Sequence, residues 1–512
     1  MTLKEKIYQL FITDVQRVNQ HGGIEEFFKK YPVGGYYFNQ GDIEDVGFLM
    51  NVKVNKTSEY IKRCRELSKT PLLFCADFAV IEKGPRQFSS TWSTVDDKEY
   101  HYNIGKSFGT QLAYNDIDVL FGPCIDMVFQ RLSDLNSKTS VTTPDFNGRL
   151  HAQVVKGLQD MGIAATAKHF PGQGTYHVNF HYGPGKNVLS YEEWMKTFGL
   201  AYKKVFEEDC MCVMTSHIVF PDYCYESEDG FPPITTYSKK ITQGLLKGEL
   251  GFKGAVVTDA LIMGGMAIGD QVKEAVQAFK CGADFLLCPP LEAAEAIEKA
   301  ILDGEIPMSR LEDALERTQR VKDFVAKNKK KVNQEDIDFA HKTVWDSYTK
   351  SAQLLKNENN ALPLKKEDKI LVIGNAPDDN RMVRAELVCE ELKKLGYNAT
   401  FQKYLLTCYQ EEINEIVDPY DKVIFVLNHP TALGEFQHCA STTWASHHVD
   451  KKKKIIFNGV LPFISEDYYP DEKCIVNTNL ILTPDTIPTL TKQLTDVNSF
   501  IGKADIKLDG LR

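Results

Sequence analysis

The chain has 512 residues, of which 43% are hydrophobic and 25% are charged, and its formal net charge is −10. A chain of this length can bury a full core and should hold two or three domains. The negative charge, without a long basic stripe, argues against a nucleic-acid-binding protein. The opening MTLKEKIYQLF lacks the apolar segment and cleavage site of a signal peptide, and no apolar run reaches membrane-spanning length.

Twelve cysteines are scattered along the chain, several of them inside apolar segments. No Cys-x-x-Cys pair occurs, and Cys210 and Cys212 would share one face of a strand, which suits a zinc site poorly. Reduced, mostly buried thiols are typical of an intracellular protein. The sequence therefore predicts a cytoplasmic protein that needs no metal ion or cofactor and binds neither nucleic acid nor membrane. Its oligomeric state is left open.

Seven short apolar, β-rich segments recur along the first part of the chain, with helix-sized stretches between them. They lie at 33–39, 71–78, 119–127, 163–170, 210–218, 255–260 and 283–289. Strands that alternate with helical crossovers indicate an α/β fold with a parallel sheet. A series this long and even favours a closed, TIM-like (β/α)8 barrel over an open sheet. An eighth strand is not evident, so we expect the barrel to be incomplete or irregular at one point.

Five of these segments end in charged or imidazole side chains. The residues concerned are Asp77, Asp126, the pair Lys168 and His169, His217, and Asp259. The carboxyl ends of all strands meet at one face of a barrel, and that face carries the active site. One buried aspartate could belong to a structural ion pair, but five such strand ends favour a shared site.

The third of these strand ends is the most informative. Lys168 and His169 end an apolar run and are followed by a Pro/Gly turn, with His177 and His181 close behind. A buried strand that opens into a glycine-rich loop is how α/β enzymes present groups to a ligand. Lys168 and His169 are donors suited to sugar or phosphate oxygens. The imidazole of His181, with an ordinary pKa of about 6.5, suits proton exchange near neutrality. The alternative for these histidines is a solvent-facing loop cluster.

The carboxylate of Asp259 arrives on a buried strand, without an adjacent Arg or Lys in the sequence. Such a group suits a nucleophile or an electrostatic stabiliser. By residue chemistry alone, the sequence predicts a barrel enzyme with an aspartate, a Lys–His pair and a loop histidine, and it does not name the substrate.

The rest of the chain predicts a helix over 334–355, then strands at 369–375, 422–428, 454–458 and 474–479. This pattern indicates a smaller α/β domain. We place the catalytic barrel at 1–335, a helical linker at 336–366 and the α/β domain at 367–512. Gly374 follows a strand but begins no G-x-G-x-x-G fingerprint, so cofactor binding there is not expected.

Two motifs resemble the signatures of glycoside hydrolase family 3, in its β-N-acetylglucosaminidase branch. They are K-H-F-P-G-x-G at 168–174 and V-T-D-A-L-x-M at 257–263. The opening residues 1–7 and the segment V-M-T-S-H-I at 213–218 are similar to the family's start and fifth strand. Residues 354–364 resemble the family's junction into a second, α/β sandwich domain. The resemblance covers nearly the whole chain.

The resemblance implies a retaining exo-β-glycosidase acting on terminal β-N-acetylglucosamine or a related sugar. Asp259 would be the nucleophile and His181 the acid/base, an exception to the two carboxylates of most glycosidases. Asp77, Lys168 and His169 would hold sugar hydroxyls. The complete set of expected substrate-binding residues is Asp77, Asp126, Lys138, Lys168, His169, His177, His217 and Met263.

Four positions depart from the family pattern. Asn179 stands where an aspartate precedes the catalytic histidine, and an amide supplies no charge to raise the basicity of the imidazole. We count Asn179 with the catalytic residues as a weakened partner. Residues 78–80 replace Glu-Gly-Gly, Lys138 stands for a bidentate arginine, and Gln173 stands for a histidine. Because Asp259 and the Lys–His pair are retained, altered specificity is favoured over lost activity.

Three alternatives stay open. The first is a glycoside phosphorylase, because a neutral histidine would not repel a phosphate acceptor. The second is a catalytically impaired sugar-binding homologue in which Asn179 marks a disabled loop. The third is a barrel aldolase with Lys168 as its Schiff-base amine. A small carbohydrate or glycoside is the expected partner, and its sugar, linkage and aglycone are not specified by the sequence.

Overall fold

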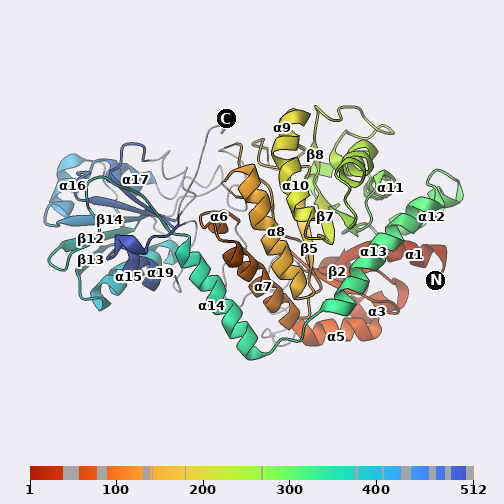
Figure 1. Cartoon of the computed structure of the whole chain (residues 1–512), viewed down its shortest axis with the longest axis horizontal. Coiled ribbons are helices and arrows are strands. Elements are labelled where there is room, and N and C mark those ends of the chain that lie inside the picture. Colours follow the sequence, from red (N-terminus) through yellow and green to blue (C-terminus); the bar gives the residue numbers. More distant parts are fainter. Residues whose placement is uncertain are drawn as a thin grey trace.

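The computed structural model describes residues 1–38, 57–77, 89–130, 139–140, 142–178, 180–266, 269–374, 379–405, 407, 409–427, 440–459, 469–478 and 486–502. These residues build an eight-stranded sheet, a six-stranded sheet and a small two-stranded one. Figure 1 shows the larger unit in red to green and the smaller one in blue, with helix α14 (Gln334–Lys350) between them.

The eight-stranded sheet is entirely parallel, in the order β10-β1-β2-β3-β4-β5-β7-β9. Its strands are β1 (Phe11–Asp14), β2 (Gly35–Phe38), β3 (Leu73–Ala76), β4 (Val119–Leu120), β5 (Ala164–Phe170), β7 (Cys212–Thr215), β9 (Ala255–Thr258) and β10 (Leu286–Leu287). An isolated parallel bridge between Val257 and Phe285 brings the two ends of the sheet together. The predicted barrel is therefore confirmed in a nearly closed form.

The strand that the sequence did not reveal is β1. It has four residues and lies between α1 (Leu3–Tyr8) and α2 (Val15–Gln20). Its last residue, Asp14, is also the N-cap of α2 and accepts a hydrogen bond from the Arg17 amide. So short a strand between two helices leaves almost no period-2 signal. Because β1 pairs with β2 and β10, it fills the position that was expected to be irregular.

Helices cover the outside of the barrel. They include α3 (Gly23–Lys30), α5 (Thr57–Leu67), α6 (Ser89–Trp92), α7 (Lys98–Tyr114), α8 (Pro144–Asp160), α9 (Tyr191–Lys196), α10 (Phe198–Phe206), the π-helix η3 (Lys240–Glu249), α11 (Gln271–Cys281), α12 (Ala293–Leu302) and α13 (Met308–Asn328). Helices α7 and α8 lie side by side (Figure 1) because two glycines let their backbones approach. A Cβ at Gly105 would lie 2.2 Å from the Val154 carbonyl oxygen, and one at Gly157 equally close to that of Tyr102.

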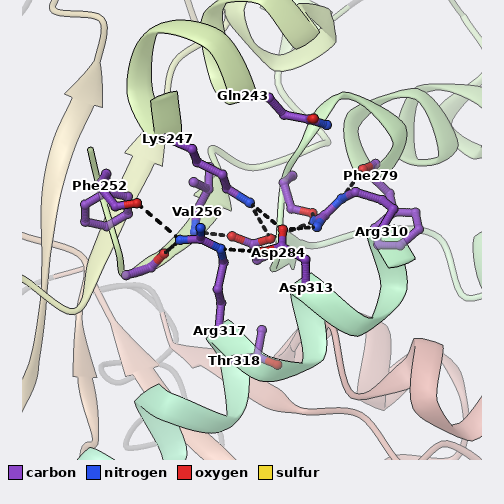
Figure 2. A network of polar contacts seen from close by, with 12 residues as sticks. Gln243, Lys247, Phe252, Val256, Phe279, Asp284, Arg310, Asp313, Arg317 and Thr318 are labelled. Atoms are coloured by element: carbon purple, nitrogen blue, oxygen red, sulfur yellow. Dashed lines mark hydrogen bonds and ion pairs between the residues drawn. The ribbon is translucent and has the colours of Figure 1, made fainter. Parts of the chain in front are cut away.

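A buried network of charges ties the β9–β10 seam to α13 and η3 (Figure 2). The side chain of Asp284, just before β10, is 0% exposed. One of its oxygens accepts from the Val256 amide at 2.8 Å, and the other accepts from Lys247 Nζ at 2.8 Å and Arg310 Nη2 at 2.6 Å. These charge-assisted bonds reinforce a seam whose backbone pairing is sparse. The network lies at the amino ends of the strands, on the face opposite the predicted site.

The second sheet has the order β11-β16-β15-β14-β12-β13. Its strands are β11 (Gln353–Asn357), β12 (Lys369–Gly374), β13 (Asn398–Gln402), β14 (Lys422–Leu427), β15 (Lys454–Asn458) and β16 (Cys474–Asn477). The helices around it include α15 (Asp379–Lys394), α16 (Gln410–Val417), α17 (Ala440–His447) and α19 (Ile487–Gln493). The four predicted strands are present as β12, β14, β15 and β16, and β13 was missed.

The helix predicted over 334–355, as part of a helical linker, is wrong for its last residues, 351–355. Helix α14 stops at Lys350, and Gln353–Asn357 forms an edge strand, β11, antiparallel to β16. Two adjacent leucines fit a helix as well as a strand, and here pairing with β16 decides between them. Within the described segments, no helix combines the length and apolar character that a membrane span requires. The ten described cysteines are all buried and form no disulfides with one another.

Candidate active site

The structure gathers six of the expected site residues into one chain of contacts at the carboxyl ends of the barrel strands. They are Asp77 after β3, Asp126 after β4, Lys168 and His169 in β5, His217 after β7, and Asp259 after β9. Lys168 forms an ion pair with Asp77. His169 lies between the carboxylates of Asp126 and Asp259, and His217 contacts the backbone of residue 260. This is the convergence that the strand ends predicted.

Asp126 is completely enclosed, with a side chain that is 0% exposed. Its Oδ2 accepts from His169 Nδ1 at 2.6 Å, from the His169 amide at 3.1 Å and from Cys124 Sγ at 3.3 Å. Its Oδ1 accepts from the Gln173 amide at 2.7 Å. Burial acts to raise the pKa of Asp126, but the charge and hydrogen bond of His169, with the two amides, hold it below its usual value. Asp126 therefore fixes the orientation of the His169 ring.

The Lys168 side chain is buried beside Asp77, with the ammonium group bonded to the carboxylate. Burial acts to lower the pKa of Lys168, but the charge and hydrogen bond of Asp77 outweigh it, so the pKa is raised. Lys168 thus remains a cation at neutral pH. A Schiff-base amine needs a depressed pKa, so this environment disfavours the aldolase alternative.

Asp259 is partly open to solvent, with 13% of its side chain exposed. The buried strand β9 delivers it, and its own amide donates to the Thr215 carbonyl at 3.0 Å. Oδ1 accepts from the Ala260 amide at 2.8 Å, whereas Oδ2 lies 4.0 Å from His169 Nε2. One oxygen is thus fixed by the backbone while the other faces the Lys–His side of the site. This arrangement suits nucleophilic attack on a bound electrophile.

The loop that follows β5 carries the remaining histidines. His177 and His181 are exposed, and their rings lie against Tyr176 and Phe180 with ring centroids 4.6 and 4.7 Å apart. Met263 is half-buried, next to Phe180. Asn179, Lys138 and the altered segment at 78–80, which were expected in the site or depart from the family pattern, lie outside the described residues.

His217 was expected to bind substrate, and in the structure protein groups contact both nitrogens of its ring. Its ring is buried, with Nδ1 2.8 Å from Thr236 Oγ1 and Nε2 3.1 Å from the Ala260 carbonyl oxygen, to which Nε2–H donates. Burial lowers the pKa of His217, although the charge of Asp259 opposes this. The carbonyl that His217 holds belongs to the residue directly after Asp259.

Two supporting residues were hard to recognise from the sequence alone. Gln173 was noted because it replaces a histidine. In the structure its amide binds Asp126 and its side chain hydrogen-bonds to Ser216 Oγ, which joins the β5 loop to the end of β7. Phe180 was missed, although its position next to His181 was the available signal. Its ring lies 5.7 Å from that of His169.

Cys124, Asp126 and His169 present sulfur, oxygen and nitrogen atoms within 4.8 Å of one another, a grouping that could hold a metal ion. Burial, with the charge of Asp126, raises the pKa of the Cys124 thiol well above its usual value. A protonated thiol donates to Asp126 and is a poor metal ligand, because metals bind the thiolate. The Asp126–His169 hydrogen bond also occupies the other two ligand atoms.

A hollow of about 760 Å³ lies at the other end of the barrel, and its lining includes Asp209, Lys253, Asp313, Arg317 and Arg320. Four of these charged side chains form two ion pairs, Arg320 with Asp209 at 2.5 Å and Arg317 with Asp313 at 2.8 Å. These ion pairs indicate that the hollow stabilises the fold, whereas the candidate active site lies at the carboxyl ends of the strands.

The family model for the glycosyl hydrolase family 3 N terminal domain matches residues 2–321. The beta-N-acetylglucosaminidase/beta-glucosidase of Cellulomonas fimi is 31% identical over 222 residues, which cover 40% of this chain and 38% of that protein. The beta-hexosaminidase of Nitrosospira multiformis is 27% identical over 216 residues, covering 41% of this chain and 60% of that protein. The chain thus matches less than two thirds of either relative's length.

Solved structures match over nearly the whole chain. The beta-glucoside phosphorylase BglX, bound to 2FGlc, has a TM-score of 0.82 at 20% identity, covering 99% of this chain and 95% of that one. A family 3 beta-N-acetylglucosaminidase from Paenibacillus has a TM-score of 0.76 at 22% identity, covering 97% of each chain. At these identities the matches establish the two-domain fold and leave the reaction open.

Proposed function

Since the chain belongs to glycosyl hydrolase family 3, we propose that it is a retaining exo-β-glycosidase acting on terminal β-N-acetylglucosamine or a related sugar. The observation that carries the proposal is the Asp259 carboxylate, with one oxygen fixed by the Ala260 amide and the other facing His169. The names of the two sequence relatives support a hexosamine as the sugar.

In the proposed reaction Oδ2 of Asp259, the oxygen that faces His169, attacks the anomeric carbon, and the bond to the leaving-group oxygen breaks as His181 donates a proton to it. A covalent glycosyl–Asp259 intermediate results. His181 then takes a proton from water, the water oxygen attacks the anomeric carbon, and Asp259 is released with the configuration retained. The double displacement returns every group to its starting protonation state.

The Lys168 ammonium and the His169 ring are the donors that we assign to the sugar hydroxyls. His169 lies 4.0 Å from Asp259, and Lys168 is close enough to interact with the Asp259 charge, in a largely buried site where hydrogen bonds to charged groups are strong. We assign supporting roles to Asp126, which orients His169, and to His217, which holds the Ala260 carbonyl. His177 and Met263 keep their proposed place at the rim of the site.

A second candidate function is phosphorolysis at the same site. The acid/base proposed here is an exposed histidine, and a neutral imidazole does not repel a phosphate anion as a carboxylate would. The raised pKa of Lys168 also keeps a cation in the cluster. The fold of the beta-glucoside phosphorylase is compatible with this candidate and does not decide it.

A panel of aryl β-glycosides that differ at C2, C3 and C6, assayed with and without inorganic phosphate, tests both candidates. Hydrolysis requires turnover without phosphate and loss of that turnover in Asp259→Asn. Phosphorolysis requires phosphate-dependent release of the aryl group and a sugar 1-phosphate product. The absence of turnover on every member in both conditions would contradict the enzyme proposal and favour a sugar-binding homologue.

A further inference from the structure

Two loops meet backbone to backbone beside Asp259. One is the segment 180–183, which carries His181, and the other begins directly after Asp259 and contains η4 (Gly264–Met266). The Gly264 amide donates to the His181 carbonyl at 2.9 Å. The acid/base loop is therefore bonded to the nucleophile loop through main-chain atoms, independently of the His181 ring.

The contact depends on two adjacent glycines. A Cβ at Gly264 would lie 2.7 Å from the His181 carbonyl oxygen and 3.1 Å from the carbonyl carbon and oxygen of Tyr182. A Cβ at Gly265 would lie 2.6 Å from the Phe180 carbonyl oxygen and 3.0 Å from His217 Cβ. These are mostly backbone atoms, so no side-chain rotation relieves the overlap. Neither glycine has the positive φ of a left-handed residue, so space, and not conformation, requires glycine here.

An apolar contact holds the same loop from the side. Phe180 is 4% exposed and packs with Ile218 and Met263, and Met263 belongs to the nucleophile loop. The Phe180 ring lies between two histidine rings, with centroids 5.7 Å from His169 and 4.7 Å from His181. The ring thus sets His181 against the sugar-binding side of the site.

The outer part of the loop has no comparable constraint. Tyr182 is 87% exposed, and a Cβ added to Gly183 would meet nothing within 4 Å. His181 itself is exposed. Burial of its own ring therefore does not fix the position of His181, whereas the backbone contact between Gly264 and His181 and the Phe180 ring both hold this part of the loop.

We propose that Gly264 and Gly265 are positioning residues for the acid/base: they form a docking surface, directly after the nucleophile, that holds the His181 loop over Asp259. This inference rests on the proposed role of His181. It deepens that role by linking the two catalytic groups through a backbone contact that only glycine permits.

The test is Gly264→Ala, with Gly183→Ala as the matched control, because that glycine lies in the same loop with open space around it. Hydrogen–deuterium exchange of the peptide covering 176–183 reports docking without any need for activity. We expect at least a fivefold faster exchange in Gly264→Ala and no change in Gly183→Ala. Unchanged exchange in Gly264→Ala would overturn the proposal.

Kinetics separate positioning from general damage. In Gly264→Ala, kcat/KM for a phenyl glycoside should fall about 10- to 100-fold, within the range that general acid catalysis contributes. A 2,4-dinitrophenyl glycoside needs no protonation, so its rate of glycosyl transfer to the enzyme should stay within about threefold, and azide should accelerate turnover. Equal losses on both substrates, without azide rescue, would overturn the proposal.

Phe180→Ala removes the apolar contact without a backbone overlap, and it covers the case in which Gly264→Ala does not fold. We expect the same dependence on the leaving group, and a uniform loss would contradict docking. If the wild-type chain turns over no glycoside but hydrogen–deuterium exchange of the 176–183 peptide is faster in Gly264→Ala, the proposed function is wrong and the proposed docking of the loop is supported. If turnover is found but exchange does not respond, the docking fails alone.

Discussion

Replacing Asp126 with asparagine tests whether the buried carboxylate holds His169 in place. The carboxylate is surrounded by four donors, three on Oδ2 and the Gln173 amide on Oδ1. An asparagine side chain offers one oxygen and one NH2 group. In either orientation of the asparagine side chain, its NH2 group faces at least one of the four donors, and that donor then has no acceptor.

The cheaper orientation keeps the oxygen toward the three donors and turns the NH2 toward the Gln173 amide. A buried donor without a partner costs about 1–3 kcal/mol, and bonds that lose their charge assistance weaken by about 1 kcal/mol. We therefore expect Asp126→Asn to lose about 2–4 kcal/mol of stability, which lowers the melting temperature of a domain of this size by about 3–6 °C. A misplaced His169 ring should lower kcat/KM by up to about 10²-fold.

The sign of the pH dependence follows from the pKa of Asp126, which is held below its usual value. A depressed carboxyl pKa contributes stability that is present above about pH 4, the unfolded value, and is lost as the pH falls toward the folded value. The difference in melting temperature between the wild type and Asp126→Asn should thus be largest at pH 7 and should decrease below pH 4.

Thermal unfolding followed by circular dichroism at pH 7 and below pH 4 checks this, with aryl-glycoside kinetics on the same samples. Asp160→Asn is the control, because Asp160 is partly exposed and pairs with Lys156 on the helix surface, where a salt bridge contributes less than about 1 kcal/mol. An Asp126→Asn variant as stable and as active as this control would refute the reasoning.

Three further predictions concern single side chains. Burial lowers the pKa of Lys322, whose Nζ donates to Gln9 Oε1 at 2.7 Å, to about 8; the wild type should therefore gain stability as the pH rises from about 8 toward 10. The lowered pKa implies that the buried ammonium costs about 3 kcal/mol at pH 7, and Lys322→Met removes this cost but leaves the Gln9 oxygen without its donor. The variant should therefore be more stable than the wild type at pH 7 by about 1–2 kcal/mol. A variant whose melting temperature depends on pH as that of the wild type does would contradict this. Arg310→Ala leaves the buried carboxylate of Asp284 with Lys247 as its remaining basic partner in the network. The free energy of unfolding, measured by thermal unfolding, should fall by about 3–5 kcal/mol. A fall of less than about 1 kcal/mol would contradict a stabilising role for the network. Lys168→Gln should lower kcat/KM on the best aryl glycoside by about 10- to 100-fold, the strength of a hydrogen bond to a charged group, and a change under threefold would remove Lys168 from sugar binding.

Much of the barrel could be predicted because its strands are buried on both faces and read as continuous apolar runs. The same reasoning failed for β1, which is four residues long and flanked by helices, and for β11, whose leucines suit either structure until β16 is present. Both misses are cases in which tertiary pairing, and not local sequence, selects the strand.

The gathering of the candidate residues could be predicted where a polar side chain lies in or directly after a strand, as at Asp259 and the Lys168–His169 pair. Sequence position could not tell which polar groups face the substrate. His217 also ends a strand, yet its ring is turned into the protein and bonded at both nitrogens. The contact of Phe180 with the His169 ring likewise depends on how the loop after β5 folds back, and its position next to His181 was the one signal in the sequence.

The central claim is that Asp259 is the nucleophile, and covalent trapping tests it most directly. The chain is incubated with activated 2-deoxy-2-fluoro β-glycosides, its intact mass is measured, and the modified peptide is sequenced. We predict one added glycosyl group, located on Asp259 and absent in Asp259→Asn. A label on another residue, or no label in a chain that also turns over no glycoside in the panel, would contradict the account.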